Sequence, residues 1–195
     1  MKADELEVLV NATDGHKEKQ CQPFLDMAVP FLLPRTPEKV LTFGREEPNR
    51  AGSCDFIVSA LYGSGANEER HAYIWEVKSP QTMIFEEDDS KERLRPTKGL
   101  VKAETQLGYY VEELRHSPSF RLKYGLGVYS EVIAAGIVIG RSDRACAPIN
   151  GLTPDDQKAR EQTALQIRRK LFYQAAGITL LTWNDLVRWI RFREK

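Results

Sequence analysis

The sequence predicts an α/β fold in which a mixed β-sheet is flanked by helices. Segments with helical spacing of apolar residues alternate with apolar runs of strand length, in the order helix, two strands, helix, strand, helix, strand, helix. The 195 residues, 42% of them hydrophobic, can bury a core without disulfides or a structural metal. Since neither a repeat nor a linker-like segment interrupts the chain, we expect residues 1–195 to form one domain.

Four segments are expected to be strands. Residues 53–61 and 71–78 are rich in β-branched and aromatic side chains, and the turn-forming residues 63–67 join them, so we expect an antiparallel pair. Residues 132–140 form a continuous apolar run, typical of a strand buried on both faces of a sheet. Residues 178–181 form a shorter strand of the same kind.

Four further segments have the spacing or the capping residues of helices: residues 17–33, residues 100–114, residues 153–176, and a terminal helix that opens at residues 182–185. Pro30 and Pro34 are expected to kink or end the first helix, and Gly177 to cap the third. Residues 86–98 carry many charges and no apolar period, which predicts a solvated loop.

Composition excludes several classes of protein. With 28 basic and 28 acidic residues the net charge is zero, so no overall field attracts nucleic acid or anionic lipid. Cys21, Cys54 and Cys146 are odd in number and widely spaced, which predicts free thiols in a reducing compartment and neither a disulfide framework nor structural zinc. The chain shows no signal-peptide core and no apolar run long enough for a bilayer, so we expect a cytoplasmic protein without membrane contact.

Charged residues at the end of one predicted strand form the strongest chemical signal. Glu76 and Lys78 are two residues apart, so their side chains leave the same face of the strand. A hairpin that turns near Gly65 sets Asp55 opposite Trp75 or Glu76 on the neighbouring strand. Two carboxylates and an ammonium group are therefore expected to share one site.

Such a group suits phosphodiester hydrolysis. Carboxylate oxygens hold Mg²⁺, which polarises the phosphate and lowers the pKa of a bound water, while Lys78 orients that water or stabilises negative charge. The alternative is a chance match, because the acid-x-Lys pattern also occurs at Asp89–Lys91 and Asp156–Lys158. Neither of these ends an apolar strand.

The order of an acid and then Glu-x-Lys on the next strand resembles the PD-(D/E)XK nucleases, although Cys54 stands where that family has proline. The chain further resembles the nuclease domain of Shedu anti-phage defence proteins. Six stretches carry this resemblance: Glu18-x-x-Cys21-Gln22-x-Phe24-Leu25, residues 54–58, residues 75–80, Gln106-Leu107-x-x-Tyr110, residues 136–141 and residues 181–186.

The resemblance implies a restriction-endonuclease-like core and a role for each matched residue. Mg²⁺, or Mn²⁺ in its place, is the implied cofactor. The implied roles are Asp55 and Glu76 as metal ligands, Lys78 as the catalytic lysine, Glu18 as an outer acid and Gln106 as a polar residue facing the site. An ordinary surface glutamate at Glu18, a polar residue bordering the core at Gln106 and a strand-opening acid at Asp55 are the alternatives.

Basic residues that follow the site strand are candidates for contacts with DNA phosphates: Arg93, Arg95, Lys98 and Lys102. The alternative is that these charges only keep a loop solvated. Residues 168–170, Arg-Arg-Lys, pose the same ambiguity.

The function implied by the resemblance is a metal-dependent DNA endonuclease in anti-phage defence, acting on DNA as a homo-oligomer, either a dimer or a tetramer. Two alternatives stay open. One is a catalytically silent module that binds nucleic acid or a partner protein, and the other is a nuclease for repair or RNA processing.

Overall fold

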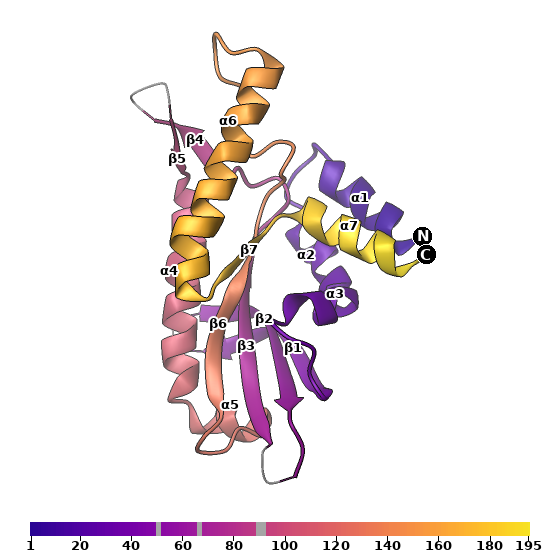
Figure 1. Cartoon of the computed structure of the whole chain (residues 1–195), viewed down its shortest axis with the longest axis vertical. Helices are drawn as coiled ribbons and strands as arrows, with labels where there is room; N and C mark the ends of the chain where they lie inside the picture. Colours follow the sequence, from indigo (N-terminus) through magenta and orange to yellow (C-terminus); the bar gives the residue numbers. More distant parts are fainter. Residues whose placement is uncertain (50–51, 66–67, 89–92) are drawn as a thin grey trace.

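A five-stranded mixed sheet forms the centre of the computed structural model, which describes residues 1–49, 52–65, 68–88 and 93–195. The strand order is β1-β2-β3-β6-β7 (Figure 1). The first three strands are antiparallel, whereas β6 runs parallel to both β3 and β7. The strands are β1 (Lys39–Asn49), β2 (Gly52–Tyr62), β3 (Glu69–Val77), β6 (Glu131–Val138) and β7 (Thr179–Leu181).

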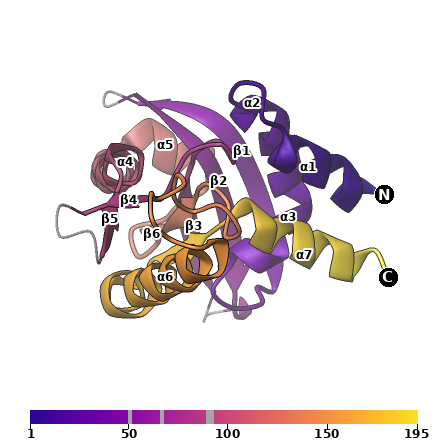
Figure 2. The same cartoon turned by 90° about the horizontal axis from the view of Figure 1, so that it is seen from above.

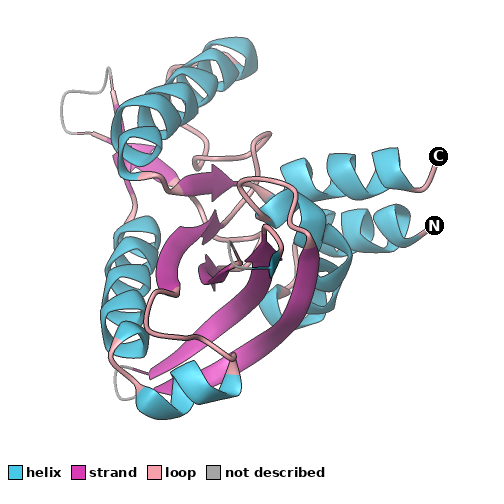
Figure 3. Cartoon of the chain, turned by 60° about the horizontal axis from the view of Figure 1, so that its bottom comes forward, coloured by secondary structure: helices cyan, strands magenta, loops and turns pink. Residues whose placement is uncertain are grey.

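Helices cover both faces of this sheet (Figures 2 and 3). One face packs against α4 (Lys98–Arg115), and the other packs against α1 (Lys2–Asn11), α3 (Leu25–Leu32) and α7 (Trp183–Arg193). Successive side chains of β2 point to opposite faces of the sheet. Ile57 therefore packs in the hydrophobic core on the α4 side, while Phe56 and Val58 pack in the core on the side of α1, α3 and α7. The predicted mixed α/β architecture is confirmed, and it is compatible with a restriction-endonuclease-like core.

The predicted helices exist but are less regular than expected. The first is divided into α2 (Glu18–Cys21), a 3₁₀ turn (Gln22–Phe24) and α3, and Pro30 lies inside α3. The third is divided into α6 (Pro154–Ile167), a π-helix (Arg168–Tyr173) and a 3₁₀ turn (Gln174–Ala176). Gly177 follows with φ of 68°, the left-handed cap that the sequence predicts.

The prediction of a solvated loop over residues 86–98 is wrong. Strands β4 (Phe85–Glu87) and β5 (Leu94–Pro96) pair as a small antiparallel hairpin. Lys98 already begins α4, because the Thr97 hydroxyl accepts a hydrogen bond from the Leu100 amide at 3.3 Å. Phe85 is buried and Leu94 packs against the core, but two apolar anchors among so many charges produce no visible period. Residues 89–92, and with them the Asp89–Lys91 pattern, lie outside the described residues.

Three elements were not expected from the sequence: α1, β1 and α5 (Pro118–Lys123). In α1 the buried residues Ala3, Leu6 and Val10 are three and four positions apart, so a narrow apolar stripe was present among the charges.

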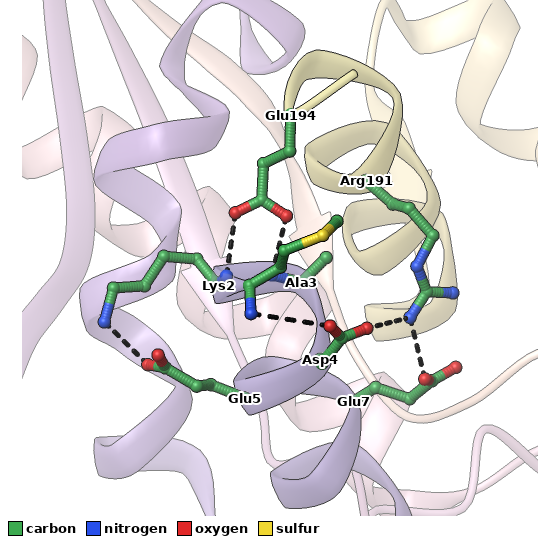
Figure 4. Close-up of polar contacts among 8 residues, drawn as sticks. Lys2, Ala3, Asp4, Glu5, Glu7, Arg191 and Glu194 are labelled. Atoms are coloured by element: carbon green, nitrogen blue, oxygen red, sulfur yellow. Dashed lines mark hydrogen bonds and ion pairs between the residues drawn. The ribbon is translucent and has the colours of Figure 1, made fainter.

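Polar contacts join α1 to α7 and bring the two chain ends together (Figure 4). The Glu194 carboxylate accepts hydrogen bonds from the backbone amides of Lys2 at 2.7 Å and Ala3 at 3.2 Å, which satisfies free donors at the start of α1. Arg191 donates to Asp4 at 3.0 Å and to Glu7 at 2.8 Å. These contacts fix α1, whose other end approaches the candidate site.

The three cysteines are buried free thiols, as predicted. None of the described helices combines the length and apolar character that crossing a lipid bilayer requires.

Asp185 caps α7 and also pairs with Arg169. Its Oδ2 atom accepts hydrogen bonds from the backbone amide and the hydroxyl of Thr182, each at 2.8 Å, and Arg169 Nη2 lies 2.6 Å away. Burial alone would raise the pKa of the Asp185 carboxyl, but Arg169 and the Thr182 donors outweigh it and hold this pKa below its ordinary value.

A carboxyl with a lowered pKa stabilises the fold above its unfolded-state pKa of about 4, and the effect disappears as pH falls through the folded-state pKa. We therefore expect Asp185→Asn to lower the free energy of unfolding by about 2 kcal/mol at pH 7. The deficit should shrink toward pH 3. Urea denaturation at both pH values measures it, with exposed Asp155→Asn as control, and a deficit independent of pH would contradict this account.

Candidate active site

The pairing of β2 with β3 places Asp55 beside the end of β3. Phe56 lies opposite Trp75, so the next position along each strand brings Asp55 to Glu76. The Asp55 carboxylate is fixed there because its Oδ2 atom accepts a hydrogen bond from the Val77 amide at 2.8 Å. The structure thus brings together the two predicted strand carboxylates.

Glu76 is the most buried charged group of the site, with 1% of its surface exposed. One carboxylate oxygen, Oε1, accepts a hydrogen bond from the Lys78 ammonium. The other oxygen, Oε2, is buried and has no hydrogen-bond partner within the described part of the chain. A buried carboxylate oxygen without a partner is costly, so this position favours the approach of a cation.

Electrostatics at the site reflect an excess of negative charge. Burial first and the Asp55 charge second raise the pKa of Glu76 to about 8, against the opposing effect of Lys78. Burial would lower the pKa of Lys78, but the charges of Glu76, Asp55 and Glu18 outweigh it and raise that pKa. Lys78 therefore keeps its proton while the carboxylates compete for positive charge.

Glu18, the first residue of α2, lies within the field of the same group. Its pKa is raised by burial first and by the Asp55 charge second, against the lowering effects of Lys78 and the Ser79 backbone. The structure therefore places the predicted outer acid close to the predicted core of the site.

Gln106 and Tyr110 approach the site from α4. Gln106 Nε2 donates to the Tyr110 hydroxyl at 3.0 Å, while Gln106 Oε1 is buried without a hydrogen-bond partner in the described ranges. Burial and then the charges of Glu76 and Asp55 raise the pKa of Tyr110, which places its hydroxyl in their field. Gly52 permits this approach, because a Cβ there would lie 3.1 Å from the Tyr110 hydroxyl oxygen.

The segment after Lys78 connects the site to the N-terminal helices. Gln81 Nε2 donates to the backbone carbonyls of Leu9 and Ala12, each at 3.1 Å. The Lys17 amide donates to Gln81 Oε1 at 3.0 Å and to Ser79 Oγ at 3.2 Å. Because Lys17 precedes Glu18, these bonds hold the start of α2 beside Lys78.

The backbone of Lys78 is fixed on both sides. Its amide donates to the Val138 carbonyl at 2.8 Å, and its carbonyl accepts from the buried Trp183 indole at 2.7 Å. Neither Trp183 nor Gln81 was among the residues predicted for the site from the sequence. The position of Gln81 in a polar stretch directly after the site strand could have indicated its role. The contact of Trp183 with Lys78 spans 105 positions, so no local sequence pattern indicates it.

The predicted DNA-contacting residues divide into two groups. Arg93 and Arg95 lie on the β4–β5 segment, where Arg93 pairs with Asp88 at 3.6 Å and Arg95 with Glu86 at 2.9 Å. The exposed Lys98 and Lys102 lie in the first turns of α4. Lys102 is one helical turn before Gln106, so it lies nearest the site along that helix.

Residues 168–170 have other contacts. Arg168 pairs with Glu104 at 2.5 Å and Arg169 with Asp185 at 2.6 Å, whereas Lys170 is exposed. The two arginines therefore contribute to tertiary structure.

The site residues suit a magnesium ion that keeps most of its water. No three His, Cys, Asp or Glu side chains among the described residues form a closed metal-binding group. Mg²⁺ does not need one, since it commonly takes one or two carboxylates and completes its shell with water or phosphate. Asp55 and the unpartnered Oε2 of Glu76 are such a pair, and their mutual repulsion is what a divalent cation relieves.

Gln81→Ala should loosen the connection between the N-terminal helices and the site, because it removes the side-chain hydrogen bonds to the Leu9 and Ala12 carbonyls and to the Lys17 amide. We expect the free energy of unfolding to fall by about 2 kcal/mol. Backbone amides of residues 12–18 should also exchange faster with solvent. Urea denaturation and hydrogen exchange measure both, with the exposed Gln166→Ala as control. Unchanged exchange over residues 12–18 would refute the connection.

The comparisons with known proteins do not identify a family for this chain. A scan against protein-family models finds no match to the chain, and a search of curated proteins also finds none. The functional conclusion therefore depends on the geometry of Asp55, Glu76 and Lys78 and on the resemblance that their sequence context carries.

Proposed function

We propose that this chain is a magnesium-dependent endonuclease that hydrolyses phosphodiester bonds in DNA. The observation that carries the proposal is the unpartnered, buried Oε2 of Glu76, next to Asp55 and to the Lys78 ammonium. A carboxylate in this state gains stability from a bound cation, and the adjacent ammonium suits an anionic substrate.

Asp55 and Glu76 are the residues that would hold Mg²⁺, or Mn²⁺ in its place. The bound ion supplies a polarised phosphate and a water of lowered pKa. Asp55 contributes a ligand of fixed direction, because the Val77 amide holds its Oδ2 atom.

Lys78 supplies the positive charge at the reacting phosphate. Its backbone is held by Val138 and Trp183, so only its side chain is able to swing from Glu76 toward a substrate. There Nζ keeps its proton and donates hydrogen bonds to a phosphate oxygen or to the attacking water. The proton-retaining direction of its pKa shift suits this role.

Glu18 and Gln106 complete the polar wall. Glu18 carries a carboxyl of raised pKa, which suits a group that accepts a proton from water near neutral pH. Gln106 presents a buried amide oxygen without a partner in the described chain, which suits a hydrogen bond from a metal-bound or attacking water.

A catalytically silent binding module is the second candidate, and the same observation argues against it. A surface that only binds DNA gains nothing from a buried Glu76 carboxylate next to a half-buried Asp55, because both repel phosphate. The resemblance to Shedu nuclease domains supports anti-phage defence, a cytoplasmic location and a homo-oligomer that offers one site to each DNA strand. Repair or RNA processing are the alternative roles for the same chemistry.

Cleavage assays test the proposal directly. The purified chain should cut plasmid, linear or single-stranded DNA with Mg²⁺ and lose this activity in EDTA. Lys78→Ala should reduce the rate at least about a hundredfold, because it removes charge stabilisation in the transition state. Lys158→Ala alters a lysine in the same acid-x-Lys pattern on α6 and should cut normally. Equal cleavage by Lys78→Ala would remove the catalytic assignment, and RNA cut in preference to DNA would favour the RNA-processing alternative.

Metal binding is testable without activity. Mg²⁺ should raise the thermal midpoint of the wild-type chain, because only the folded site binds it. Asp55→Asn should abolish this shift while retaining the bond from Val77. Without metal, the free energy of unfolding of Asp55→Asn should be the same as that of the wild type or higher by up to about 1 kcal/mol. The reason is that the substitution removes a charge that repels Glu76. A large loss of stability without metal, or a Mg²⁺-induced shift of the thermal midpoint equal to that of the wild type, would contradict the assignment of Asp55 as a ligand. Asp155→Asn, which lies outside the site, is the control.

A further inference from the structure

A cavity of about 690 Å³ lies between β5 and the helical segment formed by α6 and the π-helix. The described residues that line it include none of the five predicted catalytic residues, but they include Arg93 and Arg95, which were predicted to contact DNA. It falls within the usual size range of small-molecule sites, roughly 300–1,000 Å³. This cavity is therefore separate from the candidate active site.

The walls of the cavity are positively charged. Arg93 and Arg95 line it from the hairpin, and Arg160 and Arg168 line it from the facing helix. Asp88 is the one acidic side chain among the described lining residues. Three of these arginines are paired with carboxylates, Arg93 with Asp88, Arg95 with Glu86 and Arg168 with Glu104, so an anionic ligand competes with existing ion pairs.

The ion pairs of the hairpin arginines are exposed and replaceable. The side chain of Arg93 is 77% exposed and pairs with Asp88 at 3.6 Å, while that of Arg95 is 49% exposed and pairs with Glu86 at 2.9 Å. Exposed pairs of this kind contribute little to stability. A phosphate group, which guanidinium groups bind in a bidentate manner, competes well for both side chains.

Arg168 adds a donor that lacks a partner. Its Nη2 atom pairs with Glu104, but its Nε atom is buried and makes no hydrogen bond with the described residues. The guanidinium carbon lies 4.4 Å from the centre of the Phe172 ring, so a planar cation covers an aromatic face. Both residues belong to the π-helix, a form that occurs frequently at functional sites.

Apolar side chains provide the rest of the lining. Phe85, Leu94, Pro96, Ile167 and Phe172 contribute to the walls, and two of them remain open to solvent, Ile167 at 47% and Phe172 at 55%. An exposed phenylalanine beside a stacked guanidinium is a platform on which a flat heterocycle stacks. An acidic peptide without aromatic residues would use the arginines but has no flat ring for this platform.

We propose that this cavity binds a nucleoside phosphate, with its phosphates on Arg93, Arg95 and Arg160 and its base against the Arg168–Phe172 stack. The same chemistry is present in a free nucleotide and in a nucleotide of a single DNA strand. None of its residues belongs to the proposed metal site, whereas Arg93 and Arg95 are also predicted contacts for DNA phosphates, so a DNA-strand ligand extends the proposed function.

Calorimetric titration of the full chain in EDTA tests the site, since EDTA removes metal-mediated phosphate contacts at the carboxylates. ATP and AMP should bind more tightly than adenosine or inorganic phosphate. Arg160→Ala and Phe172→Ala should each weaken nucleotide binding about tenfold, through the phosphate and the base respectively. Arg115→Ala, an exposed α4 arginine paired with Glu112, should leave binding unchanged. Lys78→Ala should also bind normally, which separates this result from the fate of the nuclease proposal.

A further titration with a DNA trinucleotide distinguishes a free nucleotide from a DNA strand as the ligand. Tighter binding of a DNA trinucleotide than of ATP assigns the cavity to a DNA strand, and the reverse order assigns it to a free nucleotide. Absence of binding at millimolar ATP and trinucleotide overturns the proposal. The proposal is also overturned if Phe172→Ala binds ATP as tightly as the wild type does, or if an acidic peptide binds as tightly as ATP.

Discussion

Glu76 lies on β3 between an antiparallel neighbour, β2, and a parallel neighbour, β6. That position removes its carboxylate from water, with 1% exposure, and raises its pKa to about 8. Burying this carboxylate therefore costs free energy of folding. The Lys78 ammonium offsets the cost at Oε1, but no described residue bonds to Oε2. Such local cost is typical of functional sites, where stability is traded for reactivity.

Around this carboxylate, hydrogen bonds hold the backbone and several of the side chains. Val77 holds Asp55, Trp183 and Val138 hold the backbone of Lys78, and Gln81 ties the start of α2 to the same segment. A site built from fixed strands with a single swinging ammonium group positions its ligands in advance of binding. The N-terminal helix contributes indirectly, because its end is anchored by Gln81 and its start by Glu194.

Much of the fold was predictable because its strands and helices carry regular apolar periods. The pairing of residues 53–61 with residues 71–78, the late core strand and the Gly177 cap were all found this way. The β4–β5 hairpin was missed because Phe85 and Leu94 are isolated among charges. For the site, the spacing of Glu76 and Lys78 and the hairpin register predicted the grouping with Asp55. Trp183 could not be predicted as a partner of Lys78, since that contact depends on long-range packing.

Helix α4 joins the two regions that the structure singles out. Glu104 turns toward the π-helix, where it accepts from Arg168 at 2.5 Å and from the Tyr173 hydroxyl. Gln106, two residues later and hence on a different face, turns toward Tyr110 and the carboxylates. One rigid helix thus sets the position of an aromatic–guanidinium stack and of a polar group in the active-site wall. Because α4 is packed along its length by buried residues such as Leu107 and Leu114, the distance between the two regions is fixed by the core rather than by loops.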